Sequence, residues 1–278
     1  MVTGFSQDID RSYLAAFGYK TGQFLSSSRF ALPAPDWDRG RPDAVLSGQG
    51  DLVTDAYRAA VRAVEGPRYR EISLAVTPYG LIRAPLPAGH VTVDDAFRVL
   101  PLGIGLDGRA GYPLVTFWLT GREIRSLFEI EATLADVKED ARLQISGMRF
   151  AYDPGAPPFA RVAAVEVETG DGALEPLDDN RLYRVCTNLN GYYLRDFLAR
   201  ATGGRLTYQP KDAAGTPLTD PRALVVRRTA DPGSPEVKEW LALAIYLGAF
   251  PDRDGDGRPD IPDNYRTPQP RIVPLAAQ

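Results

Sequence analysis

The chain has 278 residues, of which 44% are apolar and 24% charged, and this composition is typical of a globular protein with a large core. Its formal net charge is −4 with acidic and basic residues interspersed, which excludes the basic signature of a nucleic-acid-binding or membrane-surface protein. The longest apolar run, near residues 241–250, is about half as long as a bilayer-spanning helix, so we expect no membrane span.

The first part of the chain alternates predicted helices and strands. Residues 8–19 are expected to form a short helix, residues 23–32 a strand, and the proline-rich and charged residues 33–43 a surface loop. Apolar residues then recur at helical spacing between residues 51 and 64, which predicts a helix, and a short buried strand is expected at residues 72–76.

Three motifs predict helix starts farther along the chain. Thr92 and Thr120 are each followed three residues later by an acid, the pattern of a capping box, so a helix should begin after each. Ser234, Pro235 and Glu236 combine a cap residue, a proline at the first helical position and an acid favoured by the helix dipole. They predict a helix that runs to about residue 247.

Strands rich in β-branched and aromatic residues are expected at residues 113–119, 143–152, 161–169 and 182–187. A helix is expected at residues 192–201. Because helices and strands alternate without a regular period, the predicted fold class is α/β (α+β), with a mixed β-sheet layered with helices. The single cysteine, Cys186, lies in the last of these strands, so it is predicted to be buried and cannot form an internal disulfide.

Several segments occur in the order seen in one known family. Residues 47–58 read Ser-Gly-Gln-Gly-Asp-Leu-Val-Thr-Asp-Ala-Tyr-Arg, residues 77–83 read Thr-Pro-Tyr-Gly-Leu-Ile-Arg, and residues 97–103 read Phe-Arg-Val-Leu-Pro-Leu-Gly. This order resembles the C-terminal, substrate-recognition domain of the 5'-nucleotidase family, in which a G-N-L-x-x-D-A-x-R helix precedes an N-G-G-G-I-R loop and an L-P-F-G strand. The similarity returns at residues 119–124, 144–154 and 183–188, and it covers about three quarters of the chain.

The resemblance implies three parts. Residues 1–22 correspond to a remnant of an interdomain linker helix, residues 23–250 to the C-terminal-like domain, and residues 251–278 to a calcium-binding loop and C-terminal extension. The family's catalytic divalent metals belong to a separate N-terminal domain. This chain has one histidine, His90, and cannot supply the clustered ligands of a two-metal centre or, without a Gly-x-Ser-x-Gly elbow, a serine triad. We therefore expect the chain alone to be inactive.

Candidate ligand-binding residues follow from the same resemblance. Arg58 and Arg83 match family arginines that hold phosphate or nucleotide, and a guanidinium can bind phosphate through paired hydrogen bonds. The alternative is that each is a surface arginine whose stem covers apolar area. Leu102 replaces the phenylalanine of the family's base clamp, and Tyr192 or Tyr193 either replaces that stacking surface or packs a helix onto the sheet. The implied ligand is a small, phosphorylated, nucleotide-like molecule, and purine specificity is left open.

The acidic run at residues 252–263 has the spacing of a Ca²⁺ loop, with oxygen ligands at positions 1, 3, 5, 9 and 12 and a glycine at position 6. Aspartates this close repel one another unless a cation compensates them; the alternative is a solvated acidic turn. Pro262 argues against an exiting helix, and the run resembles thrombospondin type 3 repeats, so a structural ion is expected. The predicted ligands are the side chains of Asp252, Asp254, Asp256, Asp260 and Asp263 and the backbone carbonyl of Arg258.

Two functions are compatible with these features. The first is a nucleotide-recognition domain of a 5'-nucleotidase-like metallophosphohydrolase, working with an N-terminal metallophosphatase domain in cis or in trans. The second is a degenerate, non-catalytic binding or adhesion module with structural Ca²⁺. The family resemblance and the acidic loop both imply an extracytoplasmic location, periplasmic or secreted, although residues 1–8 have no signal-peptide pattern.

Overall fold

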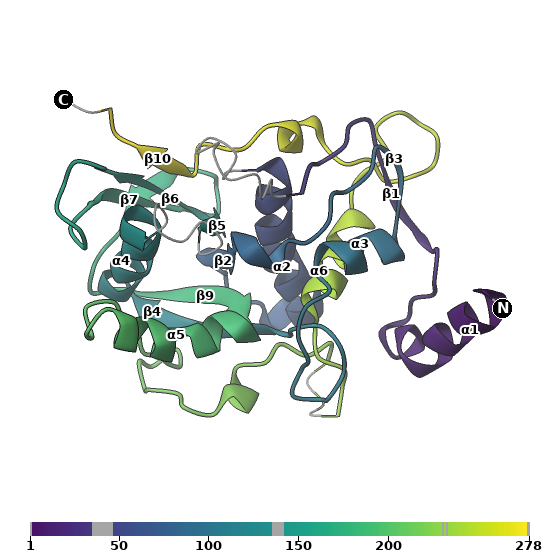
Figure 1. The fold of residues 1–278 in the computed structure, drawn as a ribbon, viewed down its shortest axis with the longest axis horizontal. Coiled ribbons are helices and arrows are strands. Elements are labelled where there is room, and N and C mark those ends of the chain that lie inside the picture. Colours follow the sequence, from purple (N-terminus) through teal and green to yellow (C-terminus); the bar gives the residue numbers. More distant parts are fainter. Residues whose placement is uncertain (1, 35–46, 135–141, 230, 232, 277–278) are drawn as a thin grey trace.

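A computed structural model describes residues 2–34, 47–134, 142–229, 231 and 233–276 of the chain (Figure 1). In Figure 1 two β-sheets lie at the left and α2 (Gly48–Glu65) descends through the middle. Helices α3 (Val93–Val99) and α6 (Glu239–Leu247) lie to its right, and the N-terminal helix lies at the right-hand end. The predicted loop at residues 33–43 falls mainly outside the described residues.

The central sheet has four strands in the order β4 (Leu114–Thr120), β9 (Leu182–Asn188), β2 (Leu74–Pro78) and β5 (Leu143–Ser146). β2 and β9 run parallel, whereas the β4–β9 and β2–β5 pairs are antiparallel. The sheet is therefore mixed, which confirms the predicted fold class. Cys186 is fully buried in β9, also as predicted.

The second sheet has the order β10 (Ile272–Pro274), β6 (Met148–Tyr152), β7 (Val162–Glu168) and β8 (Leu174–Pro176). β5 and β6 were predicted as one strand. Gly147 divides them because it has a φ of +86°, and a Cβ added there would lie 2.5 Å from a backbone oxygen. The chain therefore turns from one sheet into the other at this glycine.

One face of the central sheet packs against α2 and α6 (Glu239–Leu247), which also contact α3 (Val93–Val99) and the small sheet of β1 (Phe24–Ser28) and β3 (Gly89–Thr92). The apolar face of α2 is buried in this core, as its helical periodicity predicts. The capping box at Thr92 is confirmed at the start of α3.

The opposite face packs against α4 (Gly121–Glu129) and α5 (Leu189–Ala201). The capping box at Thr120 is confirmed at the start of α4, where the backbone N–H of Thr120 donates to the Glu123 carboxylate. No helix in the described part of the chain is both long and apolar enough to cross a bilayer. Short helical turns occupy Leu14–Phe17 (η1), Gly66–Arg68 (η3), Tyr79–Leu81 (η4), Ile130–Leu134 (η5), Pro221–Ala223 (η7) and Asp263–Arg266 (η8).

Four helix predictions were wrong in their bounds, and two of these helices begin three residues early: α2 at Gly48 rather than residue 51, and α5 at Leu189 rather than residue 192. The N-terminal helix α1 is Val2–Ser12 rather than residues 8–19. The chain then forms the tighter helical turn η1, and Gly18, which has a left-handed backbone conformation, ends that turn. The last helix begins at Glu239, not at Pro235. Residues 235–238 are extended instead, because Val237 exchanges backbone hydrogen bonds with strand neighbours on both sides.

Candidate functional site

A cavity of about 380 Å³ lies between the central sheet and helices α4 and α5. Val76, Phe117 and Val185 line it from the sheet, and Leu194 and Leu198 line it from α5. No charged side chain lines this cavity in the described part of the chain. Its chemistry therefore suits a ring or another apolar group of a ligand.

Two segments close the cavity where the parallel strands β2 and β9 end. After β2 the turn η4 places Gly80 and Leu81 in the wall. After β9 the Asn188 side chain caps α5 by accepting a hydrogen bond from the backbone of Gly191, at 2.8 Å, and Gly191 joins the opposite wall with Asn190. Carboxyl ends of neighbouring parallel strands are a frequent place for ligands in α/β sheets.

Arg83 does not line this cavity but is hydrogen-bonded to one of its wall residues. Its backbone N–H donates to the Val99 carbonyl at 2.8 Å, which fixes the segment after η4. Its exposed guanidinium donates through Nη1 to the Gly80 carbonyl at 3.2 Å, and Gly80 is a wall residue. A cationic group therefore stands beside an otherwise apolar space.

Arg58 lies at the other end of β2. Its Nε donates to the Ile72 carbonyl at 3.1 Å, and its Nη1 pairs with Glu168 of β7 at 2.8 Å. A five-residue strand such as β2 is about 15 Å long, so the two guanidinium groups do not meet in one phosphate site. The structure does not form the predicted joint site of Arg58 and Arg83, because Arg58 is used to tie α2 to the second sheet.

The two tyrosines of α5 also differ from the predicted stacking surface. The Tyr192 ring is 1% exposed, its hydroxyl donates to the Thr219 carbonyl at 2.9 Å, and the Arg195 guanidinium lies 4.0 Å from the ring centroid. Tyr192 is therefore a packing residue of the helix. Tyr193 is 50% exposed, but neither ring lines the cavity.

The acidic loop brings three of its five predicted aspartates together. Ligand oxygens of Asp252, Asp254 and Asp260 lie within 4.8 Å of one another. Backbone N–H groups of Gly257 and Gly255 donate to Asp252 and hold the pKa of its carboxyl below the usual range. The backbone around Asp260 pairs with β1, so the loop is anchored to the domain at this end.

The other predicted calcium ligands are engaged elsewhere or are peripheral. Asp263 forms an ion pair with Arg29, begins the turn η8 and is not one of the three clustered aspartates. Asp256 accepts a hydrogen bond from the backbone of Arg258 at 2.9 Å. The Arg258 side chain contacts His90 at 2.7 Å. Among the described residues, Asp256 and Asp263 lie outside the cluster of three, and the five-aspartate site stays a prediction.

A buried carboxylate that the sequence did not single out lies behind the ends of β2 and β9. Glu239 is 1% exposed, and it accepts hydrogen bonds from the Tyr57 hydroxyl and from Asn188 Nδ2, the latter at 2.9 Å. Desolvation raises the pKa of Glu239 to about 7. In the sequence, the only sign of this buried carboxylate was an acid at the start of an apolar helix. Acids are common at helix N-termini, so the pattern did not distinguish Glu239.

A profile of the family described as "5'-nucleotidase, C-terminal domain" matches residues 36–215, well over half of the chain. This chain belongs to the 5'-nucleotidase C-terminal domain family. The match spans the strands, the turn η4 and the helix α5 that enclose the cavity, together with Arg58 and Arg83. The resemblance inferred from the sequence motifs is therefore confirmed.

Named relatives of this 5'-nucleotidase C-terminal domain are longer proteins. The 5'-nucleotidase of Diplobatis ommata is 27% identical over 146 residues, which cover 50% of this chain and 24% of that protein. The NAD 5'-nucleotidase of Haemophilus influenzae is 26% identical over 235 residues, covering 81% of this chain and 35% of that protein. The 5'-nucleotidase precursor of Thermus thermophilus shares the fold over 99% of this chain and 44% of its own, with a TM-score of 0.58 and 22% identity. This chain thus spans less than half of each relative.

Proposed function

We propose that this domain recognises a small, phosphorylated, nucleotide-like ligand for a 5'-nucleotidase-type phosphohydrolase. The observation that carries the proposal is the apolar cavity at the ends of β2 and β9, together with the Arg83 guanidinium that donates to the carbonyl of its wall residue Gly80. The apolar walls fit the base or another ring of the ligand, and a guanidinium fits a phosphate group. The two chemistries lie side by side, as a nucleotide requires.

Hydrolysis is assigned in this proposal to the divalent metals of an N-terminal metallophosphatase domain, in cis or in trans. Within the described residues the one group of three or more potential metal-binding side chains is the acidic loop, which contains no histidine. Catalytic two-metal centres are built from clustered histidine, aspartate and asparagine ligands. This domain contributes positioning: it would hold the ligand while the metals activate water for attack on phosphorus.

The proposal is tested by titrating AMP and adenosine into the 278-residue chain by isothermal titration calorimetry. Arg83→Ala should weaken AMP binding about tenfold or more, because it removes a charge-assisted contact to phosphate, and should leave adenosine binding unchanged. Arg11→Ala is the control, since Arg11 is exposed on α1 and pairs only locally with Asp8. AMP binding that is absent in the wild type, or unaltered by Arg83→Ala, would contradict the proposal.

An activity assay separates this function from a non-catalytic adhesion module. A metal-loaded N-terminal domain should hydrolyse AMP faster when this chain is added, and Arg83→Ala should lower that stimulation. An adhesion module predicts no stimulation at any protein concentration. The chain by itself should show no metal-dependent turnover, because the acidic loop lacks nitrogen ligands.

We also propose that the acidic loop binds one structural Ca²⁺ through Asp252, Asp254 and Asp260. The support is the approach of their oxygens to within 4.8 Å on a loop rich in the oxygen ligands that Ca²⁺ prefers. At millimolar external calcium the ion would stabilise the C-terminal segment by mass action, which fits an extracytoplasmic location. The Asp256, Asp263 and Arg258 carbonyl oxygens remain secondary candidates.

The calcium proposal predicts slower proteolysis after residue 250 when Ca²⁺ replaces a chelator. Asp252→Asn/Asp254→Asn should abolish this protection, while Asp171→Asn, in an exposed turn, should preserve it. Equal cleavage of the wild type in both conditions would show that the loop is a solvated turn.

A further inference from the structure

A second pocket, of about 610 Å³, lies on the α2 side of the central sheet. Successive side chains of a strand point to opposite faces, so Val185 of β9 lines the apolar cavity while its neighbour Arg184 lines this pocket. Thr116 of β4 lines it as well, beside the last turn of α2 at Val64 and Glu65. The two pockets therefore use opposite faces of the same strands.

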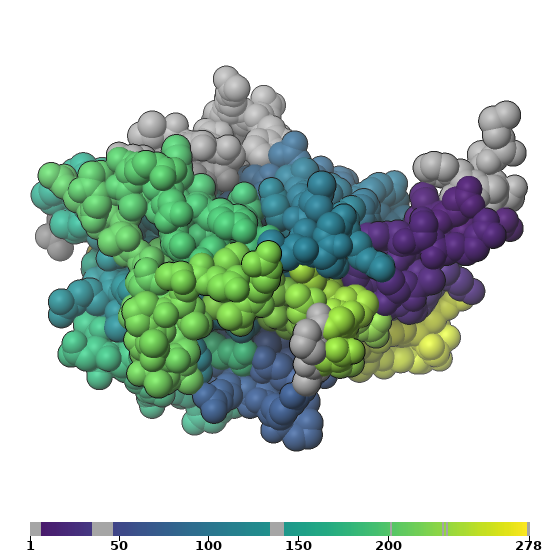
Figure 2. Space-filling model, turned by 90° about the horizontal axis from the view of Figure 1, so that it is seen from below, coloured from purple at the N-terminus to yellow at the C-terminus, as the bar shows by residue number. Residues whose placement is uncertain are grey.

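The outer wall of the pocket is the segment 222–229. Backbone hydrogen bonds hold this segment along β4: Thr116 N–H donates to the Leu224 carbonyl and Val226 N–H to the Leu114 carbonyl, each at 2.9 Å. Figure 2 views the molecule from below, where this yellow-green segment faces the reader near the blue end of α2. Because backbone pairing fixes the wall, the pocket is formed without a ligand.

Four arginines and one carboxylate line this pocket, which we call the arginine pocket: Arg68, Arg184, Arg222, Arg227 and Glu65. Glu65 is already occupied, since both its oxygens accept hydrogen bonds from Arg184, at 2.6 and 2.8 Å. Arg184 is also held by the Arg70 carbonyl at 2.7 Å and by Thr116 at 3.0 Å. The pair is thus a structural element, and the remaining three guanidinium groups carry excess positive charge.

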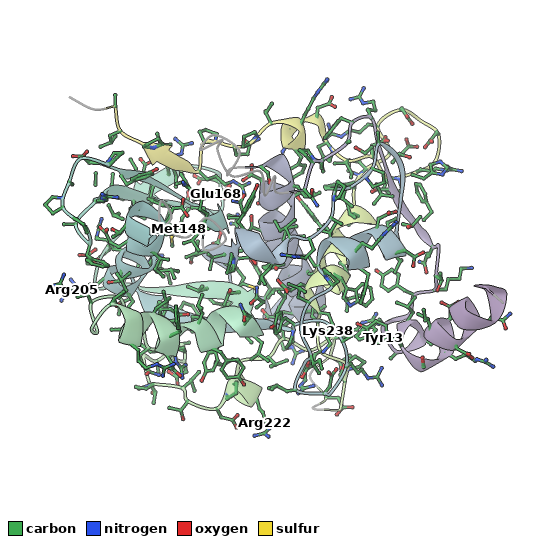
Figure 3. All side chains as sticks on the ribbon, viewed as in Figure 1. Tyr13, Met148, Glu168, Arg205, Arg222 and Lys238 are labelled. Carbon is green, nitrogen blue, oxygen red and sulfur yellow. The ribbon has the colours of Figure 1, made fainter. Side chains whose placement is uncertain are left out.

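These three arginines are only weakly compensated. The carboxylate nearest to Arg222 is Asp220 at 3.9 Å, and both side chains are largely exposed, so that pair contributes little. Arg227 lies 4.0 Å from Glu236, whose other oxygen binds Lys238 at 2.8 Å. Arg68 is exposed, and no ion pair involving it is found among the described residues. Figure 3 shows Arg222 at the lower edge of the molecule.

We propose that the arginine pocket binds an organic anion that carries two or more phosphate groups. Guanidinium groups bind phosphate in a bidentate manner, and three of them around one space suit more than one phosphate. The Thr229 hydroxyl adds a donor, and Leu224 and Val226 add an apolar wall for the organic part. A volume of about 610 Å³ is in the range of pockets that hold molecules of nucleotide size.

This second site is independent of the recognition site at Arg83, because it lies on the opposite face of the sheet. Pyrophosphate and citrate are titrated separately into the 278-residue chain at low salt, and ADP is titrated into this chain and into its Arg83→Gln variant, in which the recognition site is weakened. Pyrophosphate and ADP should bind saturably, ADP more tightly because of the apolar wall, and citrate more weakly. Arg68→Gln/Arg222→Gln should weaken both phosphate ligands about tenfold or more; both side chains are exposed, so the fold should be retained.

The control is Arg11→Gln/Arg98→Gln, which removes the same charge from two other exposed positions. It should change binding less than about twofold, and Arg83→Gln should leave pyrophosphate binding unchanged. Equal weakening of phosphate binding by the control variant would show that only the net charge matters, and would overturn the proposal. So would the absence of saturable pyrophosphate binding, or citrate binding as tight as that of pyrophosphate. Each result is separate from the AMP test, which depends on Arg83.

Discussion

The two faces of the central sheet are packed in different ways. On the α2 and α6 face the core is closed beneath the helices, and the arginine pocket lies only at its border, along the edge strand β4 and the last turn of α2. The buried polar groups Glu239 and Lys238 on this side are both hydrogen-bonded. On the α4 and α5 face the side chains leave a cavity of about 380 Å³, and Phe197 of α5 is 50% exposed. A buried network requires its partners at fixed positions, so the core beneath α2 and α6 acts as a frame, whereas the core beneath α4 and α5 leaves room for a ligand.

The largest expected effect is the loss of Trp240 from the closed face. Its ring is fully buried, lies 5.3 Å from the Phe17 ring, and donates from Nε1 to the Tyr13 hydroxyl at 2.7 Å. Trp240→Ala should lower the free energy of unfolding by about 3–5 kcal/mol, measured by urea denaturation. Phe197→Ala on the open face should cost less than about 1 kcal/mol. Similar losses for both variants would show that the two faces do not differ in packing.

The next effect is the pH dependence of the free energy of unfolding that arises from Glu239 on the closed face. Burial raises the pKa of Glu239 from 4.5 to about 7, so the folded state binds a proton that the unfolded state releases above about pH 4.5. The contribution of Glu239 to the free energy of unfolding is therefore most favourable below pH 4.5. It falls by roughly 3 kcal/mol in total as the pH rises through 7.

Glu239→Gln should remove this slope while keeping the oxygen that accepts from Tyr57 and Asn188. The measurement is the free energy of unfolding of both proteins at intervals from pH 5 to 8. The stability difference should favour the variant increasingly as pH rises. Parallel profiles would mean that Glu239 titrates normally in the folded protein.

The smallest expected effect is on the open face. Leu194→Phe places a larger ring at the cavity, where space exists, so it should change stability by less than about 1 kcal/mol. Val61→Phe inserts a similar ring into the closed core at a fully buried position of α2, and should cost about 1–3 kcal/mol. Thermal unfolding of the two variants compares the faces directly. Leu194→Phe should also weaken adenosine binding, and a variant with normal adenosine affinity would place the ligand elsewhere.

Motifs within a few residues of one another predicted the structure well. The capping boxes at Thr92 and Thr120 each join residues three apart, so the same hydrogen bonds form wherever the helix is placed. The amphipathic pattern of α2 was similarly sufficient, because one face of it had to be buried. The irregular alternation of helices and strands also predicted the mixed sheet.

Predictions that depended on distant partners were less successful. Ser234, Pro235 and Glu236 have the composition of a helix start, but residues 235–238 are extended because strand partners and a buried ion pair from Lys238 to Asp107 compete for them. Local propensity is a weak preference, and several long-range hydrogen bonds outweigh it. The start of this helix was therefore misplaced by four residues, from Pro235 to Glu239.

The sequence by itself determined the family, the mixed α/β class, the capped helices and the acidic loop, because each depends on neighbouring residues or on their order along the chain. Only the tertiary structure decided which charges meet. Arg58 pairs with Glu168, 110 residues away, and Asp263 with Arg29, 234 residues away, so neither remains where the motifs suggested. An ion pair forms between whichever charges the folded chain brings within a few ångströms, and sequence separation carries no information about that distance.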